Sequence, residues 1–289
     1  MPVPPLRRAL CFSDYSVCGA LSICAVLLYS KGMATIIAFC NQKGGVGKTT
    51  TTINTGAYLA SMGQKVLVID LDSQANATSG LGISQENVTI SLYHVLSDGT
   101  HPKDAIIPTS IENYHVLPAS VDLAGAAIEL ISAPSREFKL FEVVQKIAPD
   151  YDFILIDCPP SLGILTINGL VAAQKLVIPV QCEYYALEGL SQLLKTIALV
   201  KEHISPEVSV MGAVLTMYDR RNKLAHEVEK EMRANFPAHV FQSVIPRSVS
   251  LAEAPSYGKT IMEYKWLSYG AMAYKSLAKE ILDLQTKTS

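Results

Sequence analysis

The sequence lacks an excess of charge of either sign. Its 24 lysine and arginine residues nearly balance its 26 aspartate and glutamate residues, and the formal net charge is −2. Attraction to nucleic acid through overall basicity is therefore excluded, and any such contact requires a local basic patch. Only 17% of the residues are charged while 49% are hydrophobic, so the chain can bury a substantial core.

Cysteine is sparse and is not spaced for metal binding. The six cysteines are Cys11, Cys18, Cys24, Cys40, Cys158 and Cys182. They form no CxxC pair and no Cys/His pattern typical of a metal site, and a chain of 289 residues does not need disulfides for stability. We therefore expect reduced thiols and a cytoplasmic protein.

The first 32 residues differ in character from the rest of the chain. Arg7 and Arg8 precede the apolar run Val17–Tyr29, which is the outline of a signal peptide. The run is short for a membrane span, and no small-residue cleavage site follows it. We expect residues 1–32 to be a disordered extension or to precede a true translation start at Met33. A membrane-associating tail and an export signal are the alternatives.

From Met33 onward, short apolar runs alternate with stretches of helical periodicity. The predicted strands are Thr35–Cys40, Lys65–Asp70, Tyr114–Pro118, Phe153–Asp157, Lys175–Val180, Ser209–Thr216 and His239–Val244. The predicted helices are Thr49–Met62, Leu123–Ile131, Glu137–Ala148, Leu165–Ala173, Glu188–His203, Leu224–Asn235 and Gly270–Leu284. This alternation is typical of a mostly parallel sheet covered by helices on both faces. Because no repeat or change of composition interrupts it, we predict a single doubly wound α/β domain over residues 33–289.

A glycine-rich loop lies between the first predicted strand and the first predicted helix. Its residues are Gly44, Gly45, Val46, Gly47, Lys48, Thr49 and Thr50. Glycines let backbone N–H groups approach phosphate oxygens, and the following helix directs its positive end at the same anion. We therefore predict that the loop binds ATP, with Lys48 at the β- and γ-phosphates and the Thr49 hydroxyl on Mg²⁺.

A second lysine, Lys43, stands at the entry of this loop. From there its side chain does not easily reach the γ-phosphate bound by its own chain, but it can reach a phosphate held by a second copy. A lysine supplied across a dimer would add positive charge where the transition state develops negative charge. Lys43 therefore indicates a dimer that forms around ATP.

Three aspartates follow or end predicted strands. Asp70 and Asp72 are two residues apart and share one face of the extended chain. One of them can orient the water ligands of Mg²⁺ and the other the attacking water. Asp157 ends an apolar strand in a Walker B pattern, which predicts that it holds Mg²⁺ through water.

Four motifs resemble the ParA/Soj family of deviant Walker A ATPases, in the family's order. They are KGGVGKTT at 43–50, VLVIDLDSQANATSGLG at 66–82, FILIDCPPSLG at 153–163 and VIPRSVSLAEAPSYGKTI at 244–261. The resemblance covers essentially all of 33–289. It implies a P-loop ATPase that segregates chromosomes or plasmids, forms an ATP-sandwich homodimer, binds double-stranded DNA without sequence preference and works with a ParB-type centromere-binding partner. The protein would then associate with the nucleoid in the cytoplasm.

The resemblance also implies roles for single residues. Lys43 would act across the dimer, and Gly44 would lie where the two loops approach each other. Asp72 would position the hydrolytic water. Asp70 would then belong, with Thr49 and Asp157, to the residues that bind Mg²⁺. Pro246 and Ser248 would line the adenine pocket. The chain departs from the family pattern at three serines. Ser73 stands where the family has a proline, and Ser250 where it has an arginine. Ser248 stands where the family often has an asparagine.

Nonspecific DNA contact depends on lysine and arginine side chains that neutralise phosphates. The candidates are Arg220, Arg221 and Lys223 at a strand-to-helix turn, together with Arg247 and Lys259. The DNA-binding arginines of the family correspond to Arg221 and to Ser250, so one basic contact is absent and we expect weaker binding.

Other functions on the same scaffold have specific requirements. A MinD-like division-site regulator, the leading alternative, ends in a basic amphipathic membrane helix, whereas Ser276–Leu284 mixes charges of both signs. Membrane binding is therefore not expected, although the N-terminal apolar run is a possible substitute anchor. A metabolic ligase needs a substrate pocket beside the γ-phosphate, and an iron-protein-like reductase needs paired cluster cysteines. We find no motif for either.

Overall fold

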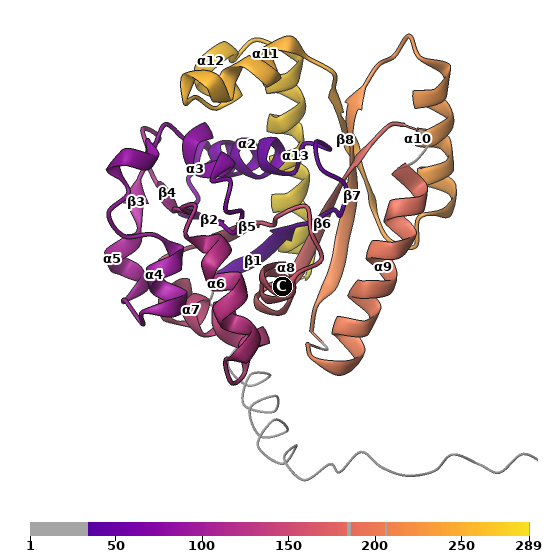
Figure 1. Ribbon diagram of the computed structural model, residues 1–289. Helices are drawn as coiled ribbons and strands as arrows, with labels where there is room; N and C mark the ends of the chain where they lie inside the picture. The colour runs from indigo at the N-terminus through magenta and orange to yellow at the C-terminus, as the bar shows by residue number, and fades with distance from the viewer. Residues whose placement is uncertain (1–33, 184–185, 206, 289) are drawn as a thin grey trace, which may run out of the picture. The chain divides into compact units, whose positions relative to one another are not determined.

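The computed structural model describes residues 34–183, 186–205 and 207–288. These residues form an eight-stranded sheet with helices packed on both faces (Figure 1). The predicted extension 1–32 lies outside the described residues, so its prediction stays untested. Within the described ranges, no helix combines the length and the apolarity that crossing a membrane requires.

The strands have the order β3-β4-β2-β5-β1-β6-β7-β8 across the sheet. Their bounds are β1 Thr35–Phe39, β2 Val66–Asp70, β3 Ile107–Pro108, β4 Tyr114–Leu117, β5 Phe153–Asp157, β6 Lys175–Gln181, β7 Ser209–Tyr218 and β8 Val240–Pro246. All neighbours pair in parallel except β3 and β4. The predicted mostly parallel, doubly wound sheet is therefore confirmed. The sequence did not reveal β3, since a two-residue strand that contains a proline shows no periodicity.

The long helices agree with the prediction and the short ones were missed. The helices are α2 Lys48–Ser61, α3 Asn76–Gly80, α4 Leu92–Ser97, α5 Pro102–Ala105, α6 Leu123–Glu129, α7 Lys139–Ile147, α8 Ile164–Ala172, α9 Ala186–His203, α10 Lys223–Asn235, α11 Val249–Glu253, α12 Ile261–Lys265 and α13 Tyr269–Thr288. Helices of four to six residues, such as α3, α5 and α12, span too few turns for an apolar face to be recognised. Tight 3₁₀ turns replace the predicted α-helix at Leu130–Ser132 and Arg136–Phe138.

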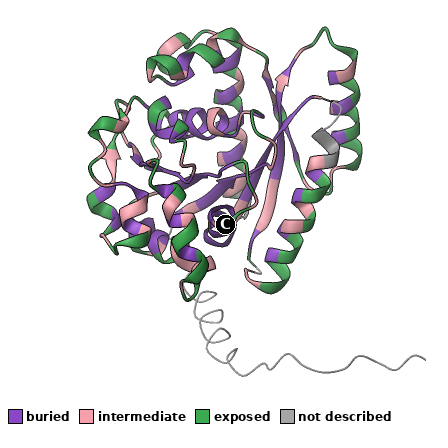
Figure 2. Ribbon diagram, in the orientation of Figure 1, coloured by how far each residue is buried: buried purple, intermediate pink, exposed green. Residues whose placement is uncertain are grey.

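The central strands are buried on both faces, as Figure 2 shows by the purple of the sheet. Every residue of β2 and β5 is buried, including the aspartates that end them. Burial on both faces explains why these strands are continuous apolar runs and do not alternate between apolar and polar residues. Burying the two aspartates costs free energy unless nearby groups compensate their carboxyl groups, so we expect hydrogen-bond donors or cations at the ends of these strands.

Strand β1 lies at the point where the chain order of the sheet reverses. It pairs with β5 on one side and with β6 on the other, and the register sets Phe39 beside Asp157 and Asp157 beside Asp70. Parallel strands present their carboxyl ends at one edge of a sheet, and ligands of open α/β sheets bind at such a reversal. The loops after β1, β2 and β5 therefore meet at one edge.

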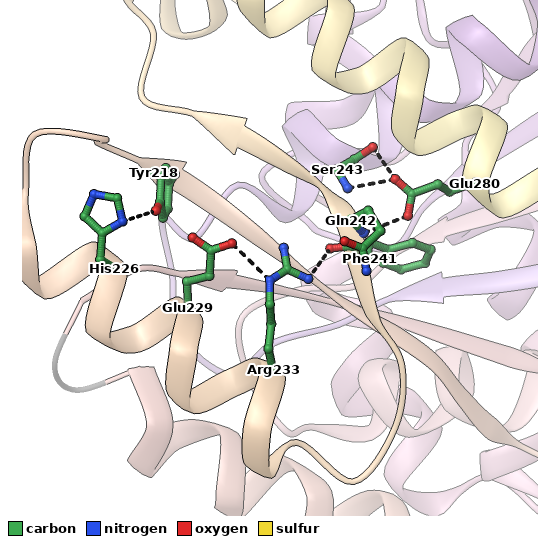
Figure 3. A network of polar contacts seen from close by, with 8 residues as sticks. All are labelled: Tyr218, His226, Glu229, Arg233, Phe241, Gln242, Ser243 and Glu280. Atoms are coloured by element: carbon green, nitrogen blue, oxygen red, sulfur yellow. Dashed lines mark hydrogen bonds and ion pairs between the residues drawn. The ribbon is translucent and has the colours of Figure 1, made fainter.

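The outer strand β8 is covered by side chains from two helices (Figure 3). Glu280 of α13 accepts hydrogen bonds from the backbone N–H groups of Gln242 (2.8 Å) and Ser243 (2.7 Å), and from the Ser243 hydroxyl. Arg233 of α10 donates to the carbonyl of Phe241 (3.4 Å). An edge strand with unpaired backbone groups invites pairing with other chains, so Glu280 both stabilises β8 and protects it.

We predict that Glu280→Ala lowers the free energy of unfolding by about 2 kcal/mol, because three donors to a charged acceptor lose their partner. Urea denaturation followed by circular dichroism measures the change. The exposed Glu112 has no hydrogen bond or ion pair to the residues that the structure describes, so Glu112→Ala is the matched control. Equal denaturation midpoints for the two variants would contradict the prediction.

Candidate functional site

The glycine-rich loop has the backbone conformation that phosphate binding requires. Gly45 and Gly47 have φ angles of 71° and 86°, in the left-handed region that side chains disfavour. A Cβ atom placed on Gly45 would meet no neighbour within 4 Å, and Gly44 and Gly45 are exposed. The loop therefore leaves open space above its backbone at the start of α2, where a phosphate chain fits.

Side chains from neighbouring strands hold this loop in place. The Asn41 side chain donates to the carbonyl of Pro179 in β6 (2.7 Å) and accepts from the backbone N–H of Lys43 (3.0 Å). The Thr216 hydroxyl of β7 donates to the carbonyl of Val46 (2.8 Å). The loop is thus anchored before a ligand binds, which reduces the entropy lost on binding.

Lys48 lies beneath the loop and is only 7% exposed. Its ammonium group donates to the carbonyl of Lys43 (3.2 Å). Burial lowers the pKa of Lys48, and the nearby Asp157 opposes this shift. A buried cation of this kind has incomplete compensation within the chain and is suited to receive an anionic ligand.

Asp157 is the acidic centre of the site. Its two carboxylate oxygens accept hydrogen bonds from the hydroxyls of Thr49 (2.7 Å) and Thr52 (3.1 Å). Burial raises the pKa of Asp157, with the neighbouring Asp70 adding to the shift, whereas the two threonines and Lys48 oppose it. A divalent cation would restore the charged form, because a nearby positive ion lowers the pKa of a carboxyl group. The Thr49–Asp157 pair therefore fits a magnesium site.

Asp70 accepts one more hydrogen bond than Asp157, and two of its three donors are backbone N–H groups of the following turn. One oxygen accepts from both the backbone N–H (2.8 Å) and the hydroxyl (2.7 Å) of Thr78, and the other accepts from the N–H of Asp72 (3.2 Å). Burial raises the pKa of Asp70, and the Thr78 hydrogen bonds limit the shift. The geometry therefore favours a structural role for Asp70, which holds the β2–α3 turn, and does not support the predicted metal role.

Asp72 lies in this turn and is only partly buried. One carboxylate oxygen accepts from the backbone N–H of Gln74 (3.0 Å), and the other accepts no hydrogen bond from the residues that the structure describes. The turn thus fixes the orientation of the carboxylate and leaves an oxygen for water. Ser73, the departure from the family pattern, does not interrupt the turn.

Among residues 34–183, 186–205 and 207–288, no cluster of three or more histidine, cysteine, aspartate or glutamate side chains is arranged to hold a metal ion. This is compatible with Mg²⁺ at a phosphate site, because Mg²⁺ keeps several water ligands and is bound through few protein groups together with substrate phosphates.

The two lysines of the loop lie in different surroundings. Lys48 points into the fold, whereas the Lys43 ammonium lies 3.1 Å from the carboxylate of Glu183, beyond the end of β6, and its side chain is 39% exposed. The two positions are compatible with the separate roles predicted for them.

The segment that holds Pro246 and Ser248 continues from β8. Pro246 ends β8 beside Tyr218 of β7, and Ser248 precedes α11 without using its side chain as a helix cap. The Ser248 hydroxyl is therefore not occupied by capping. Further along, the Asn54 side chain of α2 accepts from the backbone N–H of Ile261 (2.7 Å), which attaches the segment to the helix after the loop.

The turn between β7 and α10 carries three of the five candidate DNA contacts. Arg220, Arg221 and Lys223 are exposed there, and the Arg247 backbone N–H donates to the carbonyl of Tyr218 (3.0 Å) beside them. The structure thus brings four basic residues together. Lys259 is not among them, because it follows Gly258, which packs against Gly82 next to α3. Figure 1 shows α3 and α12 well apart from α10.

This turn is held by His226 and Asp219. One ring nitrogen of His226 donates to the carbonyl of Arg220 (2.8 Å), and the other pairs with the Tyr218 hydroxyl (2.8 Å; Figure 3). Asp219 accepts from two nitrogens of the Arg221 guanidinium (3.1 Å each), which lowers the pKa of Asp219 to about 2. The Arg221 side chain is 91% exposed, so it is oriented by Asp219 while facing solvent.

Several residues that build the site were not recognised in the sequence. They are Asn41, Thr52, Thr78, Glu183 and Thr216. Thr52 follows Thr49 by three residues and so lies on the same side of the helix, a spacing that the sequence does contain. Glu183 lies shortly beyond a predicted strand, and Thr216 ends one as Asp157 does, but position at a strand end does not identify the partner of either residue. Thr78 carries no comparable signal, since its role depends on tertiary packing.

Comparison with known proteins places the chain among nucleotide-dependent enzymes. A family model described as an AAA domain matches residues 34–210. The chain is 52% identical over 249 residues to the sporulation initiation inhibitor protein Soj of Bacillus subtilis, covering 86% of this chain and 98% of Soj. It is 47% identical over 262 residues to the chromosome partitioning protein ParA of Myxococcus xanthus, covering 90% and 93%. Cobyrinic acid a,c-diamide synthase of Mycobacterium smegmatis, solved with a bound ATP analog and magnesium, aligns with a TM-score of 0.79 and 36% identity over 89% of this chain and 97% of that one.

We predict that Thr216→Val weakens nucleotide binding about fivefold, because the Val46 carbonyl loses a donor worth roughly 1 kcal/mol and the loop becomes less ordered. Isothermal titration with a non-hydrolysable ATP analogue measures the affinity. Thr286→Val, at an exposed threonine of α13, is the control. An unchanged affinity in Thr216→Val would show that the hydrogen bond does not order the loop.

Proposed function

Because the chain belongs to the ParA/Soj family of chromosome-partitioning ATPases, we propose that it is an ATP-gated dimer that moves DNA cargo. ATP binding closes two protomers around two nucleotides, and the dimer binds double-stranded DNA without sequence preference. A ParB-type partner stimulates hydrolysis and returns the protein to the ATP-free form. The protein would act in the cytoplasm at the nucleoid.

The observation that carries this proposal is the separation of the two loop lysines. Lys48 is buried and bonded to the loop's own backbone, so it is suited to the phosphates of its own nucleotide. Lys43 extends to Glu183 and is partly exposed, which suits a residue that reaches a second protomer. One loop thus supplies one cation to each of two sites.

Each site residue has a separate role in the proposed hydrolysis. Backbone N–H groups of Gly44–Thr50 and the Lys48 ammonium hold the phosphates, and Asp72 accepts a hydrogen bond from the attacking water and orients it. Lys43 of the partner subunit adds positive charge as the bond to the γ-phosphate breaks. Pro246 and Ser248 contact the adenine.

Magnesium fits the pair formed by Thr49 and Asp157. The Thr49 hydroxyl would be a direct ligand and Asp157 would hold a water ligand, while Thr52 fixes the second carboxylate oxygen. The metal would supply positive charge that neutralises the phosphates. The ATP analog and magnesium in the mycobacterial synthase support this assignment for the same fold. We assign Asp70 the supporting role described above.

The proposed DNA-binding surface consists of Arg220, Arg221, Lys223 and Arg247. All four are exposed, and the His226 and Asp219 contacts hold their turn in one conformation, which reduces the entropy lost on binding. Lys259 lies elsewhere, so we leave it out of this surface. Ser250 contributes no charge at the position where the family carries an arginine.

The alternative of a MinD-like membrane regulator is less well supported by the last helix. Leu277, Ala278 and Ile281 of α13 are fully buried, and Glu280 is bonded to β8. The apolar face of this helix is therefore occupied by the protein's own core and is not available to a lipid surface.

We predict that the hydrolysis-blocked Asp72→Ala protein forms an ATP-dependent dimer in size-exclusion chromatography. Adding Lys43→Ala to it should abolish the dimer while nucleotide still binds, whereas Lys48→Ala should weaken nucleotide binding itself, since each lysine serves a different site. Persistence of the monomer in Asp72→Ala with saturating ATP would contradict the proposal.

We predict that Arg221→Ala weakens binding of the ATP-bound protein to duplex DNA and reduces the slope of log affinity against log salt by about one unit. Lys259→Ala, which removes the same charge outside the proposed surface, should leave the slope unchanged. Fluorescence anisotropy with two unrelated duplexes over a salt series measures both quantities. Equal effects of the two variants would show that the surface is misplaced.

A further inference from the structure

Glu183 lies just beyond β6, at the edge of the sheet where the phosphate loop sits. One of its carboxylate oxygens is 3.1 Å from the Lys43 ammonium. The other accepts a hydrogen bond from the Gln181 side chain (2.6 Å) and lies 3.8 Å from the Arg247 guanidinium. A single carboxylate thus contacts two cations that the sequence assigned to two different tasks.

Among the side chains that the structure describes (residues 34–183, 189–205 and 207–286), no other acidic group lies within ion-pair distance of either cation, although Asp219 acts on Arg247 electrostatically from further away. Lys43 and Arg247 each form one ion pair there, and both pairs are with Glu183. The two contacts are unequal, because the Lys43 contact is a hydrogen bond and the Arg247 contact is near the limit for an ion pair. Gln181, which is buried, fixes the carboxylate from the strand side.

We propose that Glu183 is a positioning residue that holds Lys43 within its own protomer until the partner's ATP competes for it. The proposal rests on the proposed function, in which Lys43 acts across the dimer. In the ATP-free protomer Glu183 keeps the ammonium at the loop entry. In the dimer the γ-phosphate displaces Glu183, since it carries more negative charge and lies where water is excluded.

Arg247 lowers the free energy needed to release Lys43 from Glu183. The Glu183 carboxylate is partly exposed, so water compensates part of its charge when Lys43 leaves. Arg247 is close enough to remain as the counter-charge of Glu183 when Lys43 leaves, and the Gln181 hydrogen bond stays in place. Glu183 therefore sets how much ATP is required to form the dimer, and it does so through the availability of Lys43.

Exposed ion pairs are weak, and this sets the size of the expected effect. The Glu183 side chain is 45% exposed and the Lys43 side chain is 39% exposed. Loss of this ion pair should therefore change the equilibrium between monomer and ATP-bound dimer only about two- to fivefold. The effect should also decline with salt, because screening shortens the range of the interaction to roughly 3 Å at 1 M.

The test uses Glu183→Gln in the full-length Asp72→Ala protein. The ATP concentration that gives half-maximal dimer, measured by light scattering, should fall about two- to fivefold at low salt, and the difference should vanish at high salt. Glu112→Gln, which removes the same charge elsewhere on the surface, should have no effect. Glu183→Asp keeps the charge on a shorter side chain, so its ATP concentration for half-maximal dimer should lie between those of Glu183→Gln and Glu112→Gln.

A second measurement reports on Lys43 without requiring a dimer. An amine-reactive ester should modify Lys43 faster in ATP-free Glu183→Gln than in ATP-free Glu112→Gln, as read by peptide mass spectrometry. A dimer that needs the same or more ATP in Glu183→Gln overturns this inference alone, even if labelling increases. Equal labelling rates overturn it as well. Failure of Asp72→Ala to dimerise at any ATP concentration overturns the proposed function and this inference with it.

Discussion

The parallel register that sets Asp157 beside both Phe39 and Asp70 is the constraint on which the site depends. It brings two carboxyl groups into a fully buried edge of the sheet, where burial raises the pKa of both and the charge of Asp70 raises the pKa of Asp157 further. The chain offsets this cost differently for each. Thr78 and the Asp72 backbone satisfy Asp70, whereas Asp157 receives two threonine hydroxyls and the field of Lys48. The site is thus prepared to accept a metal ion at Asp157 and to keep Asp70 in the framework.

The same strands that hold the phosphate loop also carry the proposed outer surfaces. Thr216 of β7 binds the loop at Val46, and two residues later Tyr218 begins the contacts that hold the basic turn. Gln181 of β6 fixes Glu183, which holds Lys43. The phosphate loop and the proposed partner and DNA contacts therefore share the same two strands and are joined to them by short connections.

Most of the fold was predictable because its signals are local. The apolar runs of β1, β2 and β5, and the glycine-lysine-threonine sequence of the loop, define strand, turn and helix without reference to the rest of the chain. What the sequence could not supply depends on partners distant along the chain. Asn41 meets Pro179 and Thr78 meets Asp70 only after folding. The expected metal role of Asp70 went unsupported for the same reason, since strand-end position alone does not say which donors will occupy a carboxylate.

The central claim is that each active site is completed by Lys43 from the other protomer, and mixing two inactive variants tests it most directly. In a heterodimer of Lys43→Ala and Asp72→Ala, one site has an intact Asp72 and receives Lys43 from its partner, while the other site lacks both. If Lys43 acts across the interface, an equal mixture should recover ATPase activity that neither variant has alone, up to about half of the wild-type rate when every dimer is mixed, because each mixed dimer has one complete site. A mixture as inactive as either variant alone, with heterodimers shown to form, would contradict the account.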